Sequence, residues 1–273
     1  MNSNMNDIDT VLLQLSENGQ FVLVENVALN RAYLFGDGVF ETMIYADGKI
    51  RFKETHLARM ENGCEILKID LKVTLDSFEA YLQNNYGQEA FRIRWNVYRE
   101  GLGRYSPESN FGNELYMLQK YHYQNPLIKK AYINKNIQVP KLPWSNCKTM
   151  NALVYVMANL ERQKKKYEEV ILLNSEGMIC EAGAANVFWI KNDVYYTPSL
   201  GSNCVAGIAR KIIIDELLKQ DIELIKGEFT PKEFLAADEV FTSNVTGINY
   251  ISHIDLREFE PKPIPFLETL FEV

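Results

Sequence analysis

The segment VFETMIYADGK, residues 39–49, gives the clearest structural signal in the first half of the chain. Residues 39–45 are rich in strand-forming side chains, and they end at the turn signal ADGK in residues 46–49. An Asp-Gly pair between apolar runs is typical of a tight β-hairpin. Another apolar run, FVLV, precedes it at residues 21–24. We therefore predict antiparallel strands in this part of the chain.

The residues that follow the hairpin predict a helix and a further strand. After Thr55, apolar side chains recur at helical spacing, at Leu57, Met60, Cys64 and Leu67. Residues 92–98 alternate as a half-buried strand does, with Ile93, Trp95 and Val97 on one face. Together these patterns predict an antiparallel α+β domain.

Length and proline content predict a second domain. A chain of 273 residues suggests two domains at roughly 150 residues each. Residues 121–143 contain Pro126, Pro140 and Pro143, and we place the crossover within 121–130. The predicted domains are residues 1–124 and residues 125–273.

The second half of the chain again reads as hairpins and helices. Helical patterns cover residues 150–165 and 208–218, and strands cover residues 170–173, 186–190, 194–196 and 240–242. The turn signals NSEG and KND, at residues 174–177 and 191–193, separate them. In the helix at 208–218 the expected buried stripe is Ile208, Ile212, Leu217 and Leu218.

Composition narrows the class of protein. Hydrophobic residues make up 47% of the chain, enough for a packed core, and the net charge of −7 gives no reason to bind nucleic acid. The four cysteines form no close C-x-x-C pair, so neither a metal site nor a disulfide framework is expected. Residues 1–7 lack the features of a signal peptide, and no apolar run reaches the ~20 residues of a membrane span. We expect a cytoplasmic protein.

Two residues suggest the chemistry. NCKTMN at residues 146–151 contains Lys148, and CEAGAANVF at residues 180–188 contains Glu181. A lysine can hold an aldehyde cofactor as a Schiff base and move protons, while a carboxylate keeps a pyridine nitrogen protonated. This pair predicts pyridoxal 5'-phosphate as the cofactor, although neither residue alone would do so.

Further candidates could bind a phosphate. Gly207 precedes the helix at 208–218, so the backbone N–H groups of Ile208 and Ala209 would face an anion with the positive end of the helix dipole behind them. The alternative is an ordinary helix start without a ligand. Arg59 is either a phosphate ligand or a surface arginine, and His56 is more typical of a partly buried histidine than of a catalytic base.

Glycines mark a loop that could bind substrate. REGLGRYSP at residues 99–107 follows a strand and reads as a loop. Arg104 could offer a bidentate fork to a substrate carboxylate, or it could belong to a solvated, flexible loop. The GDG at residues 36–38 lacks the G-x-G-x-x-G spacing and precedes a strand, so we interpret it as a turn.

In combination, these segments resemble the class IV aminotransferase family, the fold type IV pyridoxal phosphate enzymes. The family includes branched-chain aminotransferases, D-amino acid aminotransferases and 4-amino-4-deoxychorismate lyases. The resemblance runs from about residue 20 to 250 and lies in RAYLFGDGVFET (31–42), HLAR (56–59), KTMN (148–151), EAGAANVF (181–188), YTP (196–198), GIAR (207–210) and ADEVF (237–241).

The resemblance implies a fold and a set of roles. It implies an α+β protein with an N-terminal α/β sandwich-like domain, a C-terminal pseudo-barrel domain of the D-amino acid aminotransferase type, the cofactor between them, and a homodimer. Lys148 would be the catalytic lysine and Glu181 the partner of the pyridine nitrogen. The implied phosphate ligands are Arg59 and the N–H groups of Ile208 and Ala209, with Asn244 near the phosphate and the substrate.

Within the family, the lyases are the most similar branch. The loop pattern R-x-G-x-G-R-Y-S at residues 99–106, AANVFW at 184–189 and TSNV at 242–245 all resemble their versions of these motifs. The implied reaction eliminates pyruvate from 4-amino-4-deoxychorismate to give 4-aminobenzoate, a step of folate biosynthesis. Arg104 would bind a carboxylate of this small amino substrate. Phe40, also at the substrate site, lacks the hydroxyl of the tyrosine found in D-amino acid aminotransferases.

Departures from the lyase pattern keep other activities open. Glu100 replaces a glycine, one glycine is missing before Tyr105, and the segment after Gly247 is one residue short. The alternatives are an aminotransferase acting on a branched-chain or other amino acid, and a protein that binds pyridoxal phosphate without catalysis.

Overall fold

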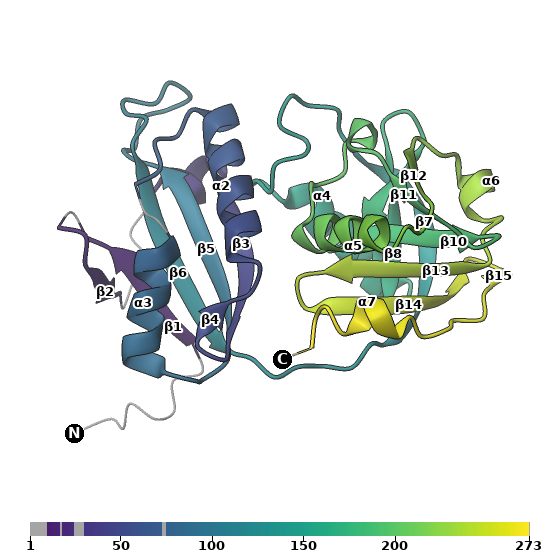
Figure 1. Ribbon diagram of the computed structural model, residues 1–273. Helices are drawn as coiled ribbons and strands as arrows, with labels where there is room; N and C mark the ends of the chain where they lie inside the picture. The colour runs from purple at the N-terminus through teal and green to yellow at the C-terminus, as the bar shows by residue number, and fades with distance from the viewer. Residues whose placement is uncertain (1–9, 17, 25–29, 73–74, 273) are drawn as a thin grey trace. The chain divides into compact units, whose positions relative to one another are not determined.

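The computed structural model describes residues 10–16, 18–24, 30–72 and 75–272, and these divide into two compact units (Figure 1). Unit 1 is Met1–His122 with Lys148–Asn151, and unit 2 is Tyr123–Cys147 with Ala152–Glu272. The mixture of helices with two curled sheets agrees with the predicted α+β class. The expected lack of a signal peptide concerns residues 1–7, which lie outside the described residues.

Unit 1 contains an antiparallel sheet of six strands among the described residues, in the order β2-β1-β6-β5-β3-β4. Its strands are β1 (Thr10–Leu15), β2 (Phe21–Leu23), β3 (Gly38–Ala46), β4 (Lys49–Ile50), β5 (Phe91–Arg99) and β6 (Gly112–Lys120). The predicted hairpin is β3–β4. Asp47 and Gly48 form its turn with φ of 51° and 75°, as a two-residue turn between twisted strands requires.

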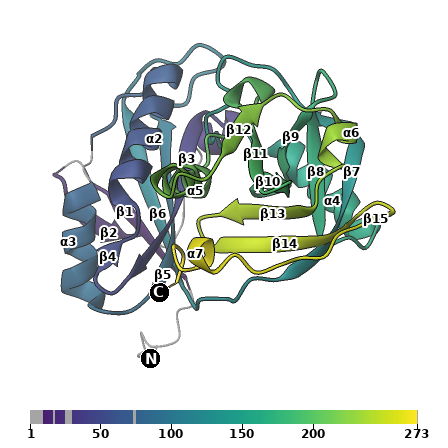
Figure 2. The same ribbon diagram turned by 45° about the vertical axis from the view of Figure 1, so that its right-hand side comes forward.

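The helices of unit 1 are α1 (Arg31–Phe35), α2 (Lys53–Leu67) and α3 (Leu75–Tyr86). Phe78 of α3 stacks on Tyr116 of β6 with ring centroids 3.9 Å apart. Gly63 of α2 packs on Val39 of β3, because a Cβ on Gly63 would be 3.1 Å from Val39 Cγ1. Since Trp95 is the cross-strand partner of Tyr116, α2 and α3 cover the sheet face that carries Val39 and Trp95 (Figures 1 and 2). Side chains alternate along β3, so the next residue, Phe40, belongs to the other face.

Unit 2 contains a curled sheet of nine strands among the described residues, in the order β12-β11-β10-β13-β14-β7-β8-β9, with β15 on β14. They are β7 (Ile128–Val139), β8 (Glu169–Asn174), β9 (Ile179–Ala182), β10 (Asn186–Lys191), β11 (Val194–Pro198), β12 (Leu224–Gly227), β13 (Glu239–Asn244), β14 (Gly247–Ile254) and β15 (Arg257–Glu258). The predicted antiparallel hairpins are β8–β9 and β10–β11. Parallel pairs also occur, between β7 and both β8 and β14, and between β11 and β12.

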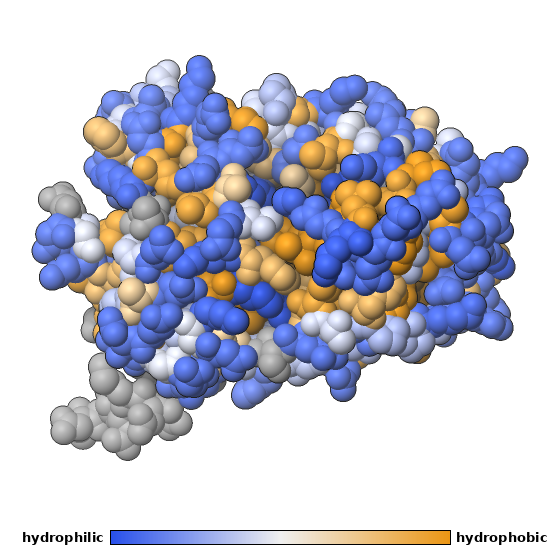
Figure 3. Space-filling view, in the orientation of Figure 1, coloured by the Kyte–Doolittle hydropathy of each residue, from blue (hydrophilic) through white to orange (hydrophobic). Residues whose placement is uncertain are grey.

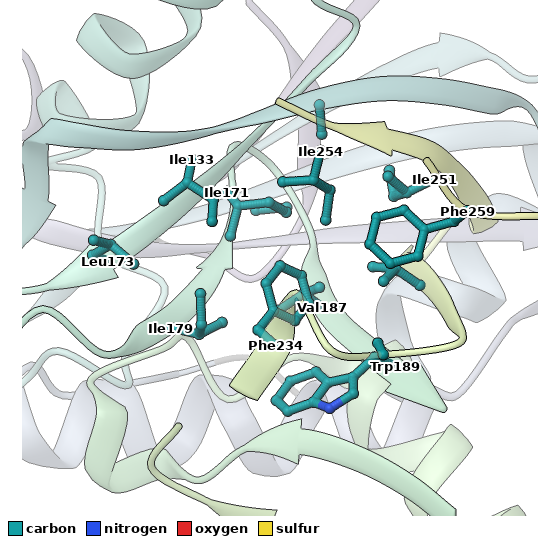
Figure 4. Packing of buried hydrophobic residues seen from close by; sticks show 14 residues of the cluster. Ile133, Ile171, Leu173, Ile179, Val187, Trp189, Phe234, Ile251, Ile254 and Phe259 are labelled. Atoms are coloured by element: carbon teal, nitrogen blue, oxygen red, sulfur yellow. The ribbon is translucent and has the colours of Figure 1, made fainter. Parts of the chain in front are cut away.

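The core of unit 2 lies inside this curled sheet (Figure 4). Ile171 of β8, Trp189 of β10 and Ile251 of β14 are at most 2% exposed. Phe234 closes the cluster, with its ring edge-on to Trp189 at 5.1 Å between centroids. Burial of such side chains is the main favourable contribution to folding.

The helices of unit 2 are α4 (Leu153–Lys164), α5 (Ile208–Lys219), α6 (Pro231–Phe234) and α7 (Pro265–Glu268), with a 3₁₀ turn, η2 (Leu200–Ser202). α4 begins later than predicted because the N–H of Met150 instead donates to the carbonyl oxygen of Gly38 in β3. The predicted buried stripe of α5 was partly wrong, since Leu218 is 61% exposed. Packing against β13 and β12 directs Ile213 and Ile214 inward instead.

Hydrophilic residues predominate on the face shown in Figure 3, with hydrophobic residues in several patches.

The helices of the described residues are all too short or too polar to cross a membrane. The four cysteines are buried free thiols.

Candidate active site

Lys148 lies in a short extended segment beside β3. The N–H of Phe40 donates to the carbonyl oxygen of Lys148, and the N–H of Met150 donates to that of Gly38, both at 2.9 Å. The sequence predicted Lys148 in the C-terminal domain, but these bonds group residues 148–151 with unit 1. The Nζ atom of Lys148 lies 4.6 Å from the ring centroid of Phe40.

The glycines of the turn at residues 36–38 make room for the lysine segment. A Cβ on Gly38 would lie 2.4 Å from the carbonyl oxygen of Val97 and 2.8 Å from the sulfur of Met150. Gly36 has φ of 64°, and its Cβ would lie 3.1 Å from Asn151. The predicted turn is confirmed, and its glycines allow the backbone around Lys148 to approach β3 closely.

The guanidinium of Arg94 lies against the ring of Phe40, as the amine of Lys148 does. The sequence analysis did not single out Arg94. Its guanidinium carbon is 3.6 Å from the centroid of Phe40, and its Nε donates to Asn96 Oδ1 at 2.9 Å. Burial lowers the pKa of Arg94 from its ordinary value. Among the described residues, neither terminal nitrogen of Arg94 has a hydrogen-bond partner, so the end of the fork can receive a carboxylate. The sequence held one signal that could have identified Arg94: it lies between the buried residues Ile93 and Trp95, so its side chain belongs to the opposite face of β5.

A buried carboxylate on the helix-covered face of the sheet holds Arg59. Arg59 donates to both oxygens of Glu41, at 2.6 and 2.5 Å, and His56 Nδ1 lies 2.7 Å from Glu41 Oε2. Burial would raise the pKa of Glu41, but Arg59 and His56 outweigh it and hold this pKa at about 2. Burial lowers the pKa of His56. Arg59 is therefore a positioned, largely buried cation, and its role toward a phosphate stays a prediction.

The predicted substrate loop is anchored at its base by arginines. Arg31 donates to the carbonyl oxygens of Leu102 and Arg104, both at 2.8 Å, and its Nε pairs with Asp37 at 2.7 Å. Arg99, the first residue of the motif, is buried and pairs with Asp37 at 3.1 Å. The side chain of Arg104 is exposed, so its predicted contact with a substrate carboxylate remains open.

Glu181, at the end of β9 in unit 2, accepts hydrogen bonds from a side chain and from a backbone N–H. Tyr155 Oη donates to Glu181 Oε1 at 2.7 Å, and the Val205 N–H donates to Oε2 at 3.1 Å. Glu181 is only 3% exposed. Burial, and then the charge of Glu181, raise the pKa of Tyr155. Burial also raises the pKa of the neighbouring thiols of Cys180 and Cys204, so both stay protonated at neutral pH.

The beginning of α5 offers unused donors. Gly207 is its N-cap residue and no side chain caps it, so the first N–H groups of α5 have no intrahelical acceptor. A Cβ on Gly207 would lie 1.8 Å from Asn186 Oδ1. Asn186 is the cross-strand partner of Ser243, so the Ser243 side chain lies on the sheet face that α5 approaches.

Buried polar atoms near this helix end lack hydrogen-bond partners. Among the described residues they include Asn203 Nδ2, Arg210 Nε and Ser243 Oγ. Arg210 and Asn203 lie in and just before the first turn of α5, and all three groups can donate a hydrogen bond. Unsatisfied donors beside the positive end of a helix dipole fit a bound phosphate.

Asn244, which the sequence placed near the phosphate, stabilises the turn after β13. Its Oδ1 accepts hydrogen bonds from the N–H and hydroxyl of Thr246 at 2.9 and 2.6 Å. Because side chains alternate along β13, those of Asn244 and Ser243 lie on opposite faces of the sheet. The predicted role of Asn244 toward the cofactor stays a prediction, and Ser243 is a residue that the sequence did not single out.

Comparison with known proteins gives a consistent family. The family model described as amino-transferase class IV matches residues 38–254. An aminodeoxychorismate lyase from Vibrio harveyi is 27% identical over 245 residues, covering 84% of this chain and 87% of the relative. A D-alanine aminotransferase from Listeria innocua is 26% identical over 236 residues, covering 83% and 81%.

Solved structures share the fold. The branched-chain aminotransferase of Thermoproteus uzoniensis, crystallised with norvaline, has a TM-score of 0.84 at 21% identity and covers 95% of this chain and 91% of that chain. An aminotransferase from Brucella abortus bound to pyridoxal phosphate has a TM-score of 0.83 at 18% identity and covers 96% and 98%. These likenesses support the architecture of both units.

Proposed function

The chain belongs to the class IV aminotransferase family of pyridoxal phosphate-dependent enzymes, and we propose that it is a 4-amino-4-deoxychorismate lyase. In this reaction pyruvate leaves the substrate and 4-aminobenzoate remains. Support comes from the loop pattern at residues 99–106 and from the similarity to the Vibrio harveyi lyase. The observation that carries the proposal is the placement of Lys148 and Arg94 on the ring of Phe40.

Lys148 is the proposed catalytic residue. When bound, pyridoxal phosphate supplies an electron sink for the bond broken at the amine-bearing carbon of the substrate. Lys148 would hold the cofactor covalently, and its freed amine would then remove the proton at that carbon and deliver it to the departing enolpyruvyl group, which leaves as pyruvate. Backbone hydrogen bonds from the carbonyl oxygen of Lys148 and the N–H of Met150 fix its segment against β3, and its Nζ lies 4.6 Å from the ring centroid of Phe40.

We propose the remaining cofactor roles for residues of both units. Glu181 would pair with the ring nitrogen as a carboxylate. The proposed phosphate ligands are Arg59, the N–H groups of Ile208 and Ala209, and the buried hydroxyl of Ser243. Ser243 takes the place proposed for Asn244, whose side chain belongs to the opposite face of β13 and accepts from Thr246.

The substrate class follows from the cations of unit 1. 4-Amino-4-deoxychorismate carries two carboxylates, and an arginine fork binds a carboxylate through two parallel hydrogen bonds. Arg94 is oriented by Asn96 and is our first candidate. Arg104 is the second, on a loop whose base Arg31 holds through backbone carbonyls. Phe40 would bring both cations to one place, because each lies within 4.6 Å of its ring centroid.

We also propose a homodimer and a cytoplasmic location. One side of α4 presents exposed apolar side chains at helical spacing, the α4 stripe, which consists of Leu153, Val156, Met157 and Leu160. A second copy of the chain would cover this stripe, because contiguous exposed apolar residues mark interaction surfaces. The four free thiols are consistent with a reducing compartment.

The direct test is product formation. Purified protein loaded with pyridoxal phosphate is mixed with 4-amino-4-deoxychorismate, and fluorescent 4-aminobenzoate and pyruvate are both measured. We expect equal amounts of the two products, and none with Lys148→Ala. A protein that holds the cofactor but releases neither product would overturn the lyase proposal.

An aminotransferase is the second candidate, because the Listeria innocua D-alanine aminotransferase is nearly as similar as the lyase. In that case the amine of a small amino acid would pass to 2-oxoglutarate. Incubation with a panel of L- and D-amino acids and 2-oxoglutarate would then yield glutamate. Glutamate formation without 4-aminobenzoate would replace the lyase by this activity.

A further inference from the structure

Tyr155 and Glu181 form a partly buried hydrogen-bonded pair, and the roles proposed above do not include Tyr155. Tyr155 is on α4, and its hydroxyl donates to Glu181 Oε1 at 2.7 Å. The second oxygen of Glu181 accepts from the N–H of Val205 at 3.1 Å. The two donors come from different elements, a helix and the loop before α5, so together they fix the plane of the carboxylate.

The donor from the loop is itself held in place. The carbonyl oxygen of Val205 accepts from Asn186 Nδ2 at 2.9 Å and from the N–H of Gly207 at 2.8 Å. Val205 therefore has little freedom to follow Glu181 if the carboxylate turns. Tyr155 is the donor on a side chain, and it is the one that a substitution can remove without changing the backbone.

We propose that Tyr155 is a positioning residue that keeps Glu181 ionised, so that a proton shared with a cofactor ring nitrogen stays on the nitrogen. This inference rests on the proposed function and deepens it. A hydrogen bond to the charged form of a carboxylate favours that form, while burial without donors favours the neutral acid. Without the Tyr155 hydroxyl, Glu181 would be more basic and would draw the shared proton to itself.

The phenol is suited to this task because it remains a donor. Its surroundings disfavour the phenolate, so it does not compete for the proton at working pH. It also packs within the core cluster of Tyr132, Val170 and Leu172. Packing alone predicts that Tyr155→Phe changes nothing at Glu181, whereas the positioning role predicts a change in the electronic state of the bound ring.

The test uses the holoenzyme reconstituted with pyridoxal phosphate labelled with ¹⁵N in the ring. Tyr155→Phe removes only the hydroxyl, and Tyr167→Phe is the matched control because Tyr167 packs against the same cluster. The ¹⁵N resonance reports where the proton lies. A hydrogen bond to a charged group is strong enough that its loss should change the proton distribution by about tenfold.

We expect the ring resonance of Tyr155→Phe to move toward that of an unprotonated ring, with Tyr167→Phe unchanged. An unchanged resonance in Tyr155→Phe, with the cofactor still attached to Lys148, would overturn the inference and leave the proposed function intact. A wild-type protein that never attaches the cofactor to Lys148 would overturn both.

A second measurement does not depend on the folding of Tyr155→Phe. Fluorotyrosine is placed at position 155 or at position 167, and its ¹⁹F resonance is compared before and after cofactor loading. We expect the signal at 155 to move, because Glu181 shares its charge with the ring when the cofactor binds, and the signal at 167 to stay. A silent probe at 155 in cofactor-loaded protein would overturn the inference.

Discussion

Acid should unfold unit 1 through one buried carboxylate, Glu41. Its pKa of about 2, against an ordinary 4.5, corresponds to about 3 kcal/mol of stability at about 1.36 kcal/mol per tenfold change in proton binding. Because the unfolded chain binds this proton more tightly, the contribution is present above pH 4.5 and is lost as the pH falls toward 2. The lowered pKa of His56 acts in the same direction, from its ordinary value of 6.5 downward.

Glu41→Gln should remove most of this pH dependence. The variant leaves Arg59 without its carboxylate, and loss of one partner of a buried pair costs about 3–5 kcal/mol. Hydrogen exchange of peptides from β3 and α2 is followed in urea from pH 7 to pH 3. These peptides report the stability of unit 1 separately from that of unit 2. We expect a steep loss of protection in the wild-type protein and a lower, flatter curve in Glu41→Gln. Glu61→Gln, an exposed position on α2, is the control, and equal slopes for all three proteins would refute the reasoning.

Three further substitutions address the site and the surface. Gly207→Ala would place a Cβ 1.8 Å from Asn186 Oδ1, so the start of α5 must shift. We expect the affinity for the cofactor, measured by fluorescence titration, to fall about tenfold. An unchanged affinity would count against the phosphate site. Leu160→Glu puts a charge in the α4 stripe and should convert the dimer to a monomer in light scattering, and a variant with the wild-type mass would argue for another interface. Arg94→Leu should raise KM for the diacid by about 10-fold or more. Arg92→Leu, at an exposed position of the same strand, should leave KM unchanged. If Arg94→Leu and the wild-type protein have equal KM values, Arg94 does not bind the substrate.

The sequence was sufficient for the elements that depend on local signals. The Asp47-Gly48 turn, the alternation of β5 and the helical spacing of α2 each follow from side chains within a few residues of one another. Lys148 and Glu181 could be singled out because a lysine and a carboxylate in those motifs are typical of one cofactor. The family match over residues 38–254 agrees with that interpretation.

What the sequence could not show depends on contacts between distant segments. The parallel pairing of β7 with β8 and β14 has no turn signal, because long connections separate the strands. The attachment of residues 148–151 to β3 depends on the absence of a Cβ at Gly36 and Gly38. In the sequence, Arg94 is one of several polar residues on the alternating strand at residues 92–98, so nothing there marked it as a site residue.

Every proposed role depends on a covalent bond between Lys148 and pyridoxal phosphate, and mass spectrometry can detect this bond. Holoenzyme is reduced with borohydride, digested and sequenced peptide by peptide. We expect the mass of the reduced cofactor on the peptide that contains Lys148, and no modified peptide in Lys148→Ala. Label on a different lysine, or a fully loaded protein without label, would contradict it.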